Sequence, residues 1–255
     1  SIAGYSPYIQ WVITVFMLLF GVNFNLYYLI LIKRFRTAVR STEMWTYFGI
    51  VGASTAIITA NIFSMSGSFS RSLRDAAFQV ASIITTTGYS TVDFDRWPSL
   101  SKTVLVILMF IGACAGSTGG GFKVSRVIIL FKMIKRELVK LLHPRSVRVI
   151  RFEGKPLDEA TVSNTGSYLA VYSVCFFAIL LTISVDGFDL ETNFTAVASC
   201  FNNIGPGLSK VGPMMNFSCY SPFSTAVLSA AMLLGRLEIF PILLAAAPST
   251  WSKRK

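Results

Sequence analysis

The sequence predicts an all-α membrane protein with five transmembrane helices and two re-entrant pore helices, which enter the membrane without crossing it. The first observation is composition: 53% of the 255 residues are hydrophobic and only 14% are charged, whereas soluble domains carry about 25% charged residues. The second is that charges are absent from five long stretches and from two shorter ones. So few charges could not cover a soluble core, and the 21 Phe exclude a disordered chain.

The five transmembrane helices follow from the long uncharged stretches. Each stretch supplies about 20 apolar residues of helix, the length that crosses a hydrocarbon core of ~30 Å. The expected spans are residues 9–32, 45–65, 103–122, 165–185 and 222–245. The first stretch has no positively charged start and is too long for a signal peptide, so we expect it to remain as a span.

The connections between these spans alternate in charge. Lys and Arg are concentrated in residues 33–43 and 123–159 and in the tail 253–255, whereas the other connections carry acids and bases in similar number. Cytoplasmic loops of membrane proteins are the basic ones, which predicts an amino end outside and a carboxyl end in the cytoplasm. A lipid bilayer therefore accounts for the net charge of +11, and we expect no nucleic acid partner.

Two further uncharged segments, 76–92 and 192–209, are too short and too polar to be spans. Ser72 and Asp75 fit a capping box at the start of the first, and Asp189 can cap the second. Each segment ends in a cluster of glycines. We expect half-length helices that dip into the membrane and return as extended backbone, which is tolerated there only inside protein or along a water-filled path.

An internal repeat supports this arrangement. Aligning Gly88 with Gly205 superimposes two copies of Val-Ala-Ser, residues 80–82 and 197–199, and similar Met-to-Gly motifs follow in the next span. The predicted organisation is a last helix of a preceding repeat (1–40), a span–pore helix–span repeat with a basic loop (41–155) and a second such repeat (156–255).

A glycine after a dipping helix is typical of a cation site. A dehydrated monovalent cation needs a ring of oxygens, which extended backbone can supply, and glycine permits backbone angles that turn consecutive carbonyls to one axis. The carboxyl end of each short helix adds partial negative charge. The expected positions are Thr86, Thr87, Gly88, Asn203, Ile204 and Gly205. The alternative is a pair of ordinary glycine turns at the membrane surface.

The run Gly116-Ser-Thr-Gly-Gly-Gly121 interrupts the third predicted span. Each glycine weakens a helix by about 1 kcal/mol, so we expect a flexible intramembrane loop; close helix packing through small residues is the alternative. The run is not a nucleotide-binding phosphate loop, because Phe122 precedes Lys123 and Val124 stands where Ser or Thr is needed.

Arg236 lies near the middle of the last predicted span, where a charge is costly and usually faces a pore or a partner. It is either a positive barrier in an ion path or a cation that reaches toward the interface. Glu238 is the only carboxylate in the predicted spans, and the single His lies in a loop. We therefore expect neither catalytic residues nor a metal cluster, and no enzyme.

Four segments resemble TrkH-type potassium uptake proteins of the Trk/Ktr/HKT superfamily: residues 85–98, 112–123, 203–207 and 232–240. The resemblance implies a channel-like subunit of the bacterial inner membrane, with four K⁺-channel-like repeats around one filter, K⁺ as the transported ion and no covalent cofactor. It implies that Gly88 and Gly205 are filter glycines and that Arg236 is a pore arginine. The implied gate loop comprises Gly116, Ser117, Thr118, Gly119, Gly120, Gly121 and Lys123.

The resemblance covers the carboxyl-terminal half of such a protein. The chain begins in what resembles the last helix of the second repeat and continues through the third and fourth, so we expect an amino-terminal half with the other two filter segments as partner. A homodimer and a cytosolic nucleotide-binding subunit of the TrkA type are further implied partners. A Na⁺-permeable member of the superfamily and an ion-coupled carrier of a small solute are the alternative functions.

Overall fold

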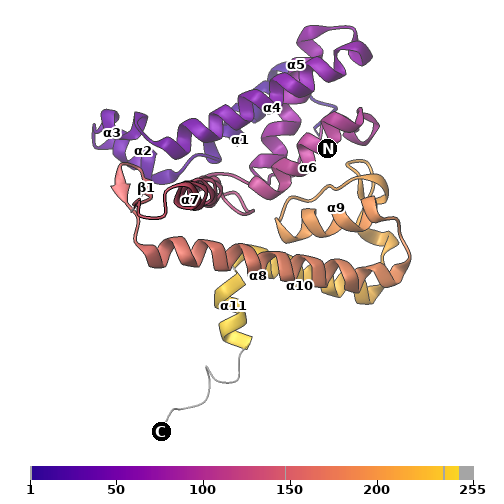
Figure 1. Cartoon of the computed structure of the whole chain (residues 1–255). Helices are drawn as coiled ribbons and strands as arrows, with labels where there is room; N and C mark the ends of the chain where they lie inside the picture. The colour runs from indigo at the N-terminus through magenta and orange to yellow at the C-terminus, as the bar shows by residue number, and fades with distance from the viewer. Residues whose placement is uncertain (1, 147, 238, 247–255) are drawn as a thin grey trace.

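The computed structural model describes residues 2–146, 148–237 and 239–246, and Figure 1 shows that these are mostly helical. Glu238 and the basic tail 253–255 lie outside the described residues. The first part comprises α1 (Pro7–Phe20), α2 (Phe24–Leu31), α3 (Phe35–Val39), α4 (Thr42–Ser66), α5 (Phe69–Ile84), η1 (Phe94–Arg96) and α6 (Ser99–Ile111). It is followed by α7 (Val124–Leu142), the antiparallel hairpin β1 (Arg151–Phe152) and β2 (Lys155–Pro156), α8 (Glu159–Ile183), η2 (Ser184–Asp186), α9 (Leu190–Phe201), η3 (Ser209–Val211), η4 (Phe217–Cys219), α10 (Pro222–Arg236) and α11 (Ile239–Ala246).

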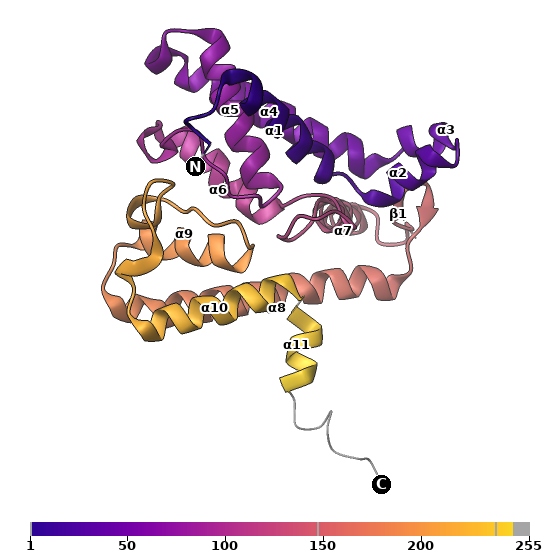
Figure 2. The same ribbon diagram turned by 180° about the vertical axis from the view of Figure 1, so that it is seen from behind.

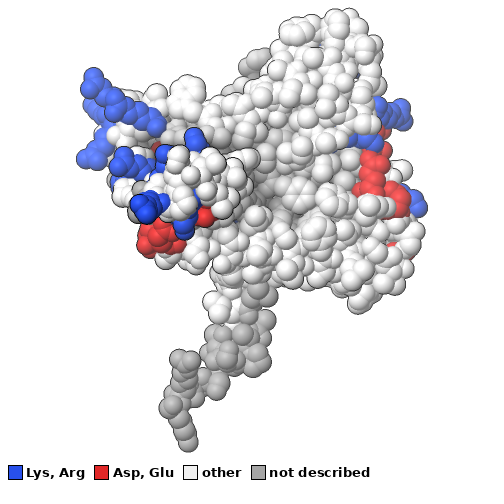
Figure 3. All heavy atoms as spheres, in the orientation of Figure 1, with Lys and Arg blue, Asp and Glu red and all other residues white. Residues whose placement is uncertain are grey.

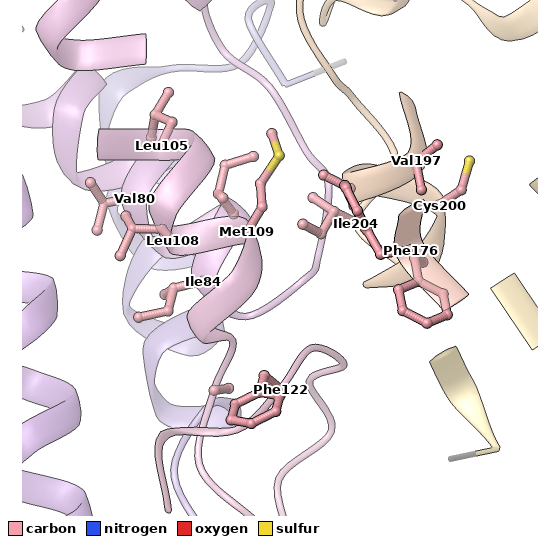
Figure 4. Packing of buried hydrophobic residues seen from close by; sticks show 14 of the residues in the cluster. Val80, Ile84, Leu105, Leu108, Met109, Phe122, Phe176, Val197, Cys200 and Ile204 are labelled. Atoms are coloured by element: carbon pink, nitrogen blue, oxygen red, sulfur yellow. The ribbon is translucent and has the colours of Figure 1, made fainter. Parts of the chain in front are cut away.

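The helices form two groups that meet at α6 and α9. Figures 1 and 2 show α1, α4 and α5 together on one side and α8 and α10 side by side on the other. Contacts of α5 with α4, α1 and α6, and of α9 with α10, α8 and α6, place the two short helices at the centre. Figure 4 shows their core, in which Ile204 lies between Met109 of α6 and Val197 of α9.

Two helices within the described ranges, α4 and α8, are long and apolar enough to cross a membrane, and the bent pair α1–α2 makes a third span if it is counted as one. The buried face of α8 includes Tyr168, Tyr172 and Phe176, and its exposed face is also apolar, with Val174, Phe177 and Leu181. A helix that is apolar on all sides is typical of a membrane span. An all-helical membrane architecture is therefore supported, while the count of five spans stays a prediction.

On the face that Figure 3 shows, charged side chains gather at the two ends of the molecule. Lys and Arg gather at the end formed by α2, α3, the hairpin and the end of α7, whereas acids and a few cations lie at the opposite end. The surface between the two ends carries no charge on the face that Figure 3 shows. This distribution fits a protein that crosses a bilayer along α8.

The first predicted span, 9–32, is not one helix. The chain bends by 88° between α1 and α2. Gly21 ends α1 against Tyr47: a Cβ on Gly21 would lie 2.4 Å from the Tyr47 hydroxyl oxygen. Asn23 then starts α2, its side-chain oxygen accepting from the backbone N–H of Asn25 (2.9 Å). The prediction of one continuous helix was wrong because this break depends on a tertiary contact and an N-cap inside an uncharged run.

The third and fifth predicted spans also end early. Helix α6 stops at Ile111, where Gly112 has a φ of +70°, and irregular backbone continues to Lys123 before α7 begins. The interruption expected at Gly116 therefore starts four residues sooner. Helix α10 ends at Arg236, and α11 begins at Ile239 and points away from the α8–α10 pair (Figure 1).

The two helices that were expected to dip into the membrane are α5 and α9, each followed by backbone without regular secondary structure. Asp189 caps α9 as predicted: its side chain accepts from the backbone N–H and the hydroxyl of Thr192 (3.0 and 2.6 Å). The capping box at Ser72 was wrong, because α5 begins one turn earlier, after Ser68. Ser72 instead lies inside the helix and bonds back to the Ser68 carbonyl oxygen.

Candidate functional site

The backbone after α5 makes a tight left-handed turn. Thr86 has a φ of +55°, and the N–H groups of Thr86 and Thr87 donate to the carbonyl oxygens of Ile83 (3.1 Å) and Ser82 (2.9 Å). This pair of bonds is the Schellman motif that ends many helices, but its left-handed position is usually glycine. A β-branched residue there is strained. Gly88 follows two residues later with a φ of +77°.

The backbone after α9 repeats this turn, 117 residues further along the chain. Asn203 has a φ of +58°, and the N–H groups of Asn203 and Ile204 donate to the carbonyl oxygens of Cys200 (3.1 Å) and Ser199 (2.9 Å). Gly205 has a φ of +123°. The alignment of Gly88 with Gly205 therefore superimposes two segments with the same turn and the same hydrogen bonds.

The two turns pack directly against each other. A Cβ on Gly88 would lie 2.0 Å from the carbonyl oxygen of Ile204, and a Cβ on Gly205 would lie 3.9 Å from the Cα of Gly88. Only glycine at position 88 permits this approach. The fold thus brings together the two glycines that the sequence singled out.

The main-chain oxygens of these turns have no hydrogen-bond donor among the residues that the structure describes. No group in the described part of the chain donates a hydrogen bond to the carbonyl oxygens of Thr86, Thr87, Gly88, Asn203, Ile204 or Gly205. Thr87 and Gly205 are exposed and Ile204 is buried, and an unpaired carbonyl oxygen binds water or another partner. Such oxygens are the atoms that can replace the water of a dehydrated cation.

The glycine-rich loop, defined here as residues 112–123, lies against both turns. The N–H of Gly120 donates to the Thr86 hydroxyl oxygen (2.7 Å), which ties the strained turn to the loop. A Cβ on Gly120 would lie 2.5 Å from the carbonyl oxygen of Asn202. A bulkier residue at position 120 would therefore separate the loop from the end of α9.

Two cations donate to carbonyl oxygens of this loop. The Arg236 guanidinium bonds to Thr118 (3.1 Å), and the Lys123 ammonium bonds to Gly119. They border a mostly polar cavity of about 170 Å³, lined by Ser117, Thr118, Gly119, Gly120, Gly121, Lys123, Arg126, Tyr168, Gly235 and Arg236. The structure thus gathers Arg236 and the residues that the sequence assigned to the loop around one cavity, except Gly116, which does not line it.

Close packing of α10 against α9 sets the position of Arg236. A Cβ on the preceding Gly235 would lie 1.7 Å from the carbonyl oxygen of Phe201. The Asn203 side chain donates to the carbonyl oxygen of Met232 in the same helix (3.0 Å). Arg236 is therefore placed by the turn at Asn203 as well as by the loop.

Sequence reasoning missed several contributors to this site. Ser82 and Ser199 belong to the repeated triplets, but their roles as acceptors in the two turns carried no signal of their own. The Tyr172 hydroxyl, which donates to the Asn202 side chain (2.9 Å), comes from a span with no pattern that points to a site. Within the described residues, no group of three His, Cys, Asp or Glu could hold a metal ion.

Comparison with known proteins shows extensive similarity. A family model described as "TrkH: Cation transport protein" matches residues 65–255. The Trk system potassium uptake protein TrkH of Escherichia coli K12 is 35% identical over 252 residues, which cover 96% of this chain and 51% of that protein. The protein of the same name from Vibrio parahaemolyticus is 40% identical over 176 residues, or 69% of this chain and 36% of that protein.

A solved structure matches the fold of this chain over nearly the whole length of the chain. The crystal structure of the potassium transporter TrkH from Vibrio parahaemolyticus superimposes with a TM-score of 0.89 at 32% identity and covers 99% of this chain and 55% of that one. The chain thus spans about half the length of the curated relatives with which it aligns over nearly all its residues.

Proposed function

Because the chain belongs to the TrkH family of cation transport proteins, we propose that it forms one half of a channel-like potassium uptake protein. The family transports cations, so the chain is not an enzyme. The relatives named above are potassium uptake proteins, and K⁺ is the ion we assign here. Na⁺ permeation in the same pore is an outcome that the flux experiment below distinguishes.

The proposed filter consists of the turns 86–88 and 203–205. The observation that carries this assignment is the contact between Gly88 and Ile204, which joins two turns whose main-chain oxygens are unpaired within the described residues. Both turns follow the carboxyl ends of buried helices, where the helix dipole adds partial negative charge. In this proposal the residue ranges 41–155 and 156–255 are two of four repeats around one axis, and the other two filter segments belong to an amino-terminal half.

The proposed gate is the glycine-rich loop. It lies beside both turns and is held by hydrogen bonds that a small movement could exchange, those of Gly120 with Thr86 and of Thr118 with Arg236. Arg236 also brings a positive charge to this point, which repels a passing cation. Movement of the loop together with Arg236 would therefore control the flow of K⁺.

The basic end of the molecule is the proposed cytoplasmic end, following the rule that cytoplasmic loops carry the excess of Lys and Arg. This end includes the hairpin, α3 and the end of α7 (Figure 3). We further propose a homodimer in the bacterial inner membrane and a cytosolic nucleotide-binding regulator of the TrkA type that contacts this end.

The test is the flux of radioactive Rb⁺, with Na⁺ as competitor, into liposomes that contain the full-length protein. A saturable Rb⁺ flux that excess K⁺ suppresses and excess Na⁺ does not is the expected result. Equal suppression by Na⁺ would assign a Na⁺-permeable pore. Absence of Rb⁺ flux would overturn the proposal and favour a carrier of a small solute.

A further inference from the structure

Glu43 is a buried carboxylate that contacts the glycine-rich loop at Ala115, whereas Arg236 contacts it at Thr118. It lies in the first turn of α4 and is 4% exposed. One of its carboxylate oxygens accepts from the backbone N–H of Ala115 (2.7 Å). The Asn23 side chain and the backbone N–H of Ser125 lie close to the same carboxylate.

These groups come from three different segments. Asn23 lies at the bend between α1 and α2, Ala115 lies in the glycine-rich loop, and Ser125 lies in the first turn of α7. A single side chain on α4 therefore holds the loop to the two helix starts on either side of it. Removing such an acceptor leaves buried donors unpaired, which costs more than the bonds themselves contribute.

The hairpin, which lies at the basic end of the molecule, fixes the first turn of α4, which carries Glu43. The Glu153 carboxylate accepts from the Ser41 hydroxyl and from the backbone N–H of Glu43, each at 3.0 Å. It thereby caps the start of α4, where the helix dipole favours a negative charge.

The conformation of Glu153 indicates that its side chain is needed there. Glu153 and Gly154 are the central residues of the hairpin turn, with φ of +50° and +76°. Turns of this kind prefer Asn-Gly or Asp-Gly, because both central residues must be left-handed. Glu is strained in this place, but it is long enough to reach the start of α4.

We propose that Glu43 is the positioning residue that holds the glycine-rich loop beside the filter turns, with Glu153 fixing the helix end from which Glu43 reaches the loop. The role of the loop as a gate rests on the function proposed above. Loss of Glu43 shifts the gate toward its open state, because it removes the buried bond at Ala115, and the loop is then held by its bonds to Thr86, to Arg236 and to the bend between α1 and α2.

The experiment compares Glu43→Ala and Glu43→Gln in the full-length protein by single-channel recording in planar bilayers with Rb⁺. Bonds to a charged group shift an equilibrium by about tenfold or more, so we expect Glu43→Ala to raise the open fraction about tenfold. Glu43→Gln keeps an acceptor for the Ala115 N–H without the charge, and we expect a rise of about threefold. Unitary conductance and the preference for Rb⁺ over Na⁺ are expected to stay unchanged, because the filter turns are intact.

Glu159 provides a matched control. It lies in the first turn of α8, as Glu43 does in α4, and pairs with Arg136 at 2.6 Å instead of with the loop. We expect Glu159→Ala and Glu159→Gln to leave the open fraction unchanged. An equal effect of the Glu43 and Glu159 variants, or an unchanged open fraction in Glu43→Ala, would overturn the proposal.

Amide hydrogen exchange of residues 112–123 tests whether Glu43 holds the loop in place, and it needs no measurement of ion flux. We expect faster exchange in this segment in both Glu43 variants, with the rest of the protein as in the wild type. If Glu43→Ala does not fold, the open fraction and the hydrogen exchange are both measured on Glu43→Gln. If the wild type conducts no Rb⁺, the proposed function fails, whereas unchanged exchange at residues 112–123 would remove the positioning role itself.

Discussion

The α-carbon of Gly88 faces the carbonyl oxygen of Ile204 so closely that a methyl group on it would lie 2.0 Å from that oxygen. Residues 116 positions apart in the chain are thereby brought into backbone contact. Because this contact joins the two turns proposed as the filter, substitutions at Gly88 test the filter assignment most directly.

Gly88→Ala in the full-length protein is expected to abolish rescue of potassium-limited growth while the protein still inserts in the membrane. The added methyl group must displace the turn at Ile204, and the positive φ adds strain of about 1 kcal/mol. Growth of a strain that lacks potassium uptake, together with the amount of protein in the membrane, measures the effect. Gly67→Ala is the control, since Gly67 has a φ of +63° and open space around it. Full rescue by Gly88→Ala would refute the assignment.

Arg236→Gln is expected to increase Rb⁺ flux several-fold, because it removes a positive charge beside the loop but keeps a donor for the Thr118 carbonyl oxygen. Arg236→Lys retains the charge and is expected to conduct as the wild type does. Flux into liposomes at matched protein content compares the two variants. If Lys and Gln have the same effect, the bond to Thr118 matters and the charge does not.

Gly235→Ala is expected to destabilise the packing of α10 on α9 by about 1–3 kcal/mol, the usual cost of overpacking, because its Cβ would lie 1.7 Å from the Phe201 carbonyl oxygen. Thermal unfolding in detergent provides the measurement. Gly49 is also helical but has no neighbour within 4 Å of its Cβ position, so Gly49→Ala should leave the melting temperature unchanged or raise it. A melting temperature of Gly235→Ala equal to that of the wild type would show that α10 can shift freely.

Asp189→Ala is expected to cost about 1 kcal/mol of stability at neutral pH, the usual value of an N-cap. Hydrogen bonds from the hydroxyl and the N–H of Thr192 lower the pKa of Asp189 below its ordinary value. A lowered pKa stabilises the fold above the unfolded pKa of about 4, and this stabilisation is lost as the pH falls through the folded pKa. The stability difference between Asp189→Ala and the wild type should therefore shrink from pH 7 toward about pH 3.

Asp158→Ala is the control for this prediction, because Asp158 occupies the N-cap of α8 without a side-chain hydrogen bond. Its melting temperature should follow that of the wild type across the same pH range. The pH-dependent part of the stability that Asp189 contributes is small, since solvent screens an exposed carboxylate. A constant difference between Asp189→Ala and the wild type at every pH would contradict the assigned cause.

The sequence could predict the parts of the fold that depend on local composition. The spans α4 and α8 follow from long uncharged runs, and the pairing of Gly88 with Gly205 follows from the repeat. It could not predict the 88° bend, because Gly21 ends α1 through contact with Tyr47, which lies in another helix.

The sequence singled out the segments around Gly88 and Gly205 but not the backbone conformation within them. Glycine was expected to make the sharp turn after each dipping helix, yet Thr86 and Asn203 take the left-handed position and the glycines follow two residues later. Glu43 was missed altogether, because its partner Ala115 is 72 residues distant and nothing local distinguishes Glu43 from a surface acid at a helix start.

The bend in the first helix and the glycine-rich loop satisfy each other's backbone. Cys114 N–H donates to the Gly21 carbonyl oxygen, Thr118 N–H to that of Phe20, and Phe24 N–H to that of Gly116. These bonds supply partners for backbone groups that would otherwise be unpaired at each interruption, so each interruption stabilises the other. Insertions or deletions in the bend between α1 and α2 should therefore be inherited only together with compensating changes in the glycine-rich loop. We expect these two distant segments to change together in evolution.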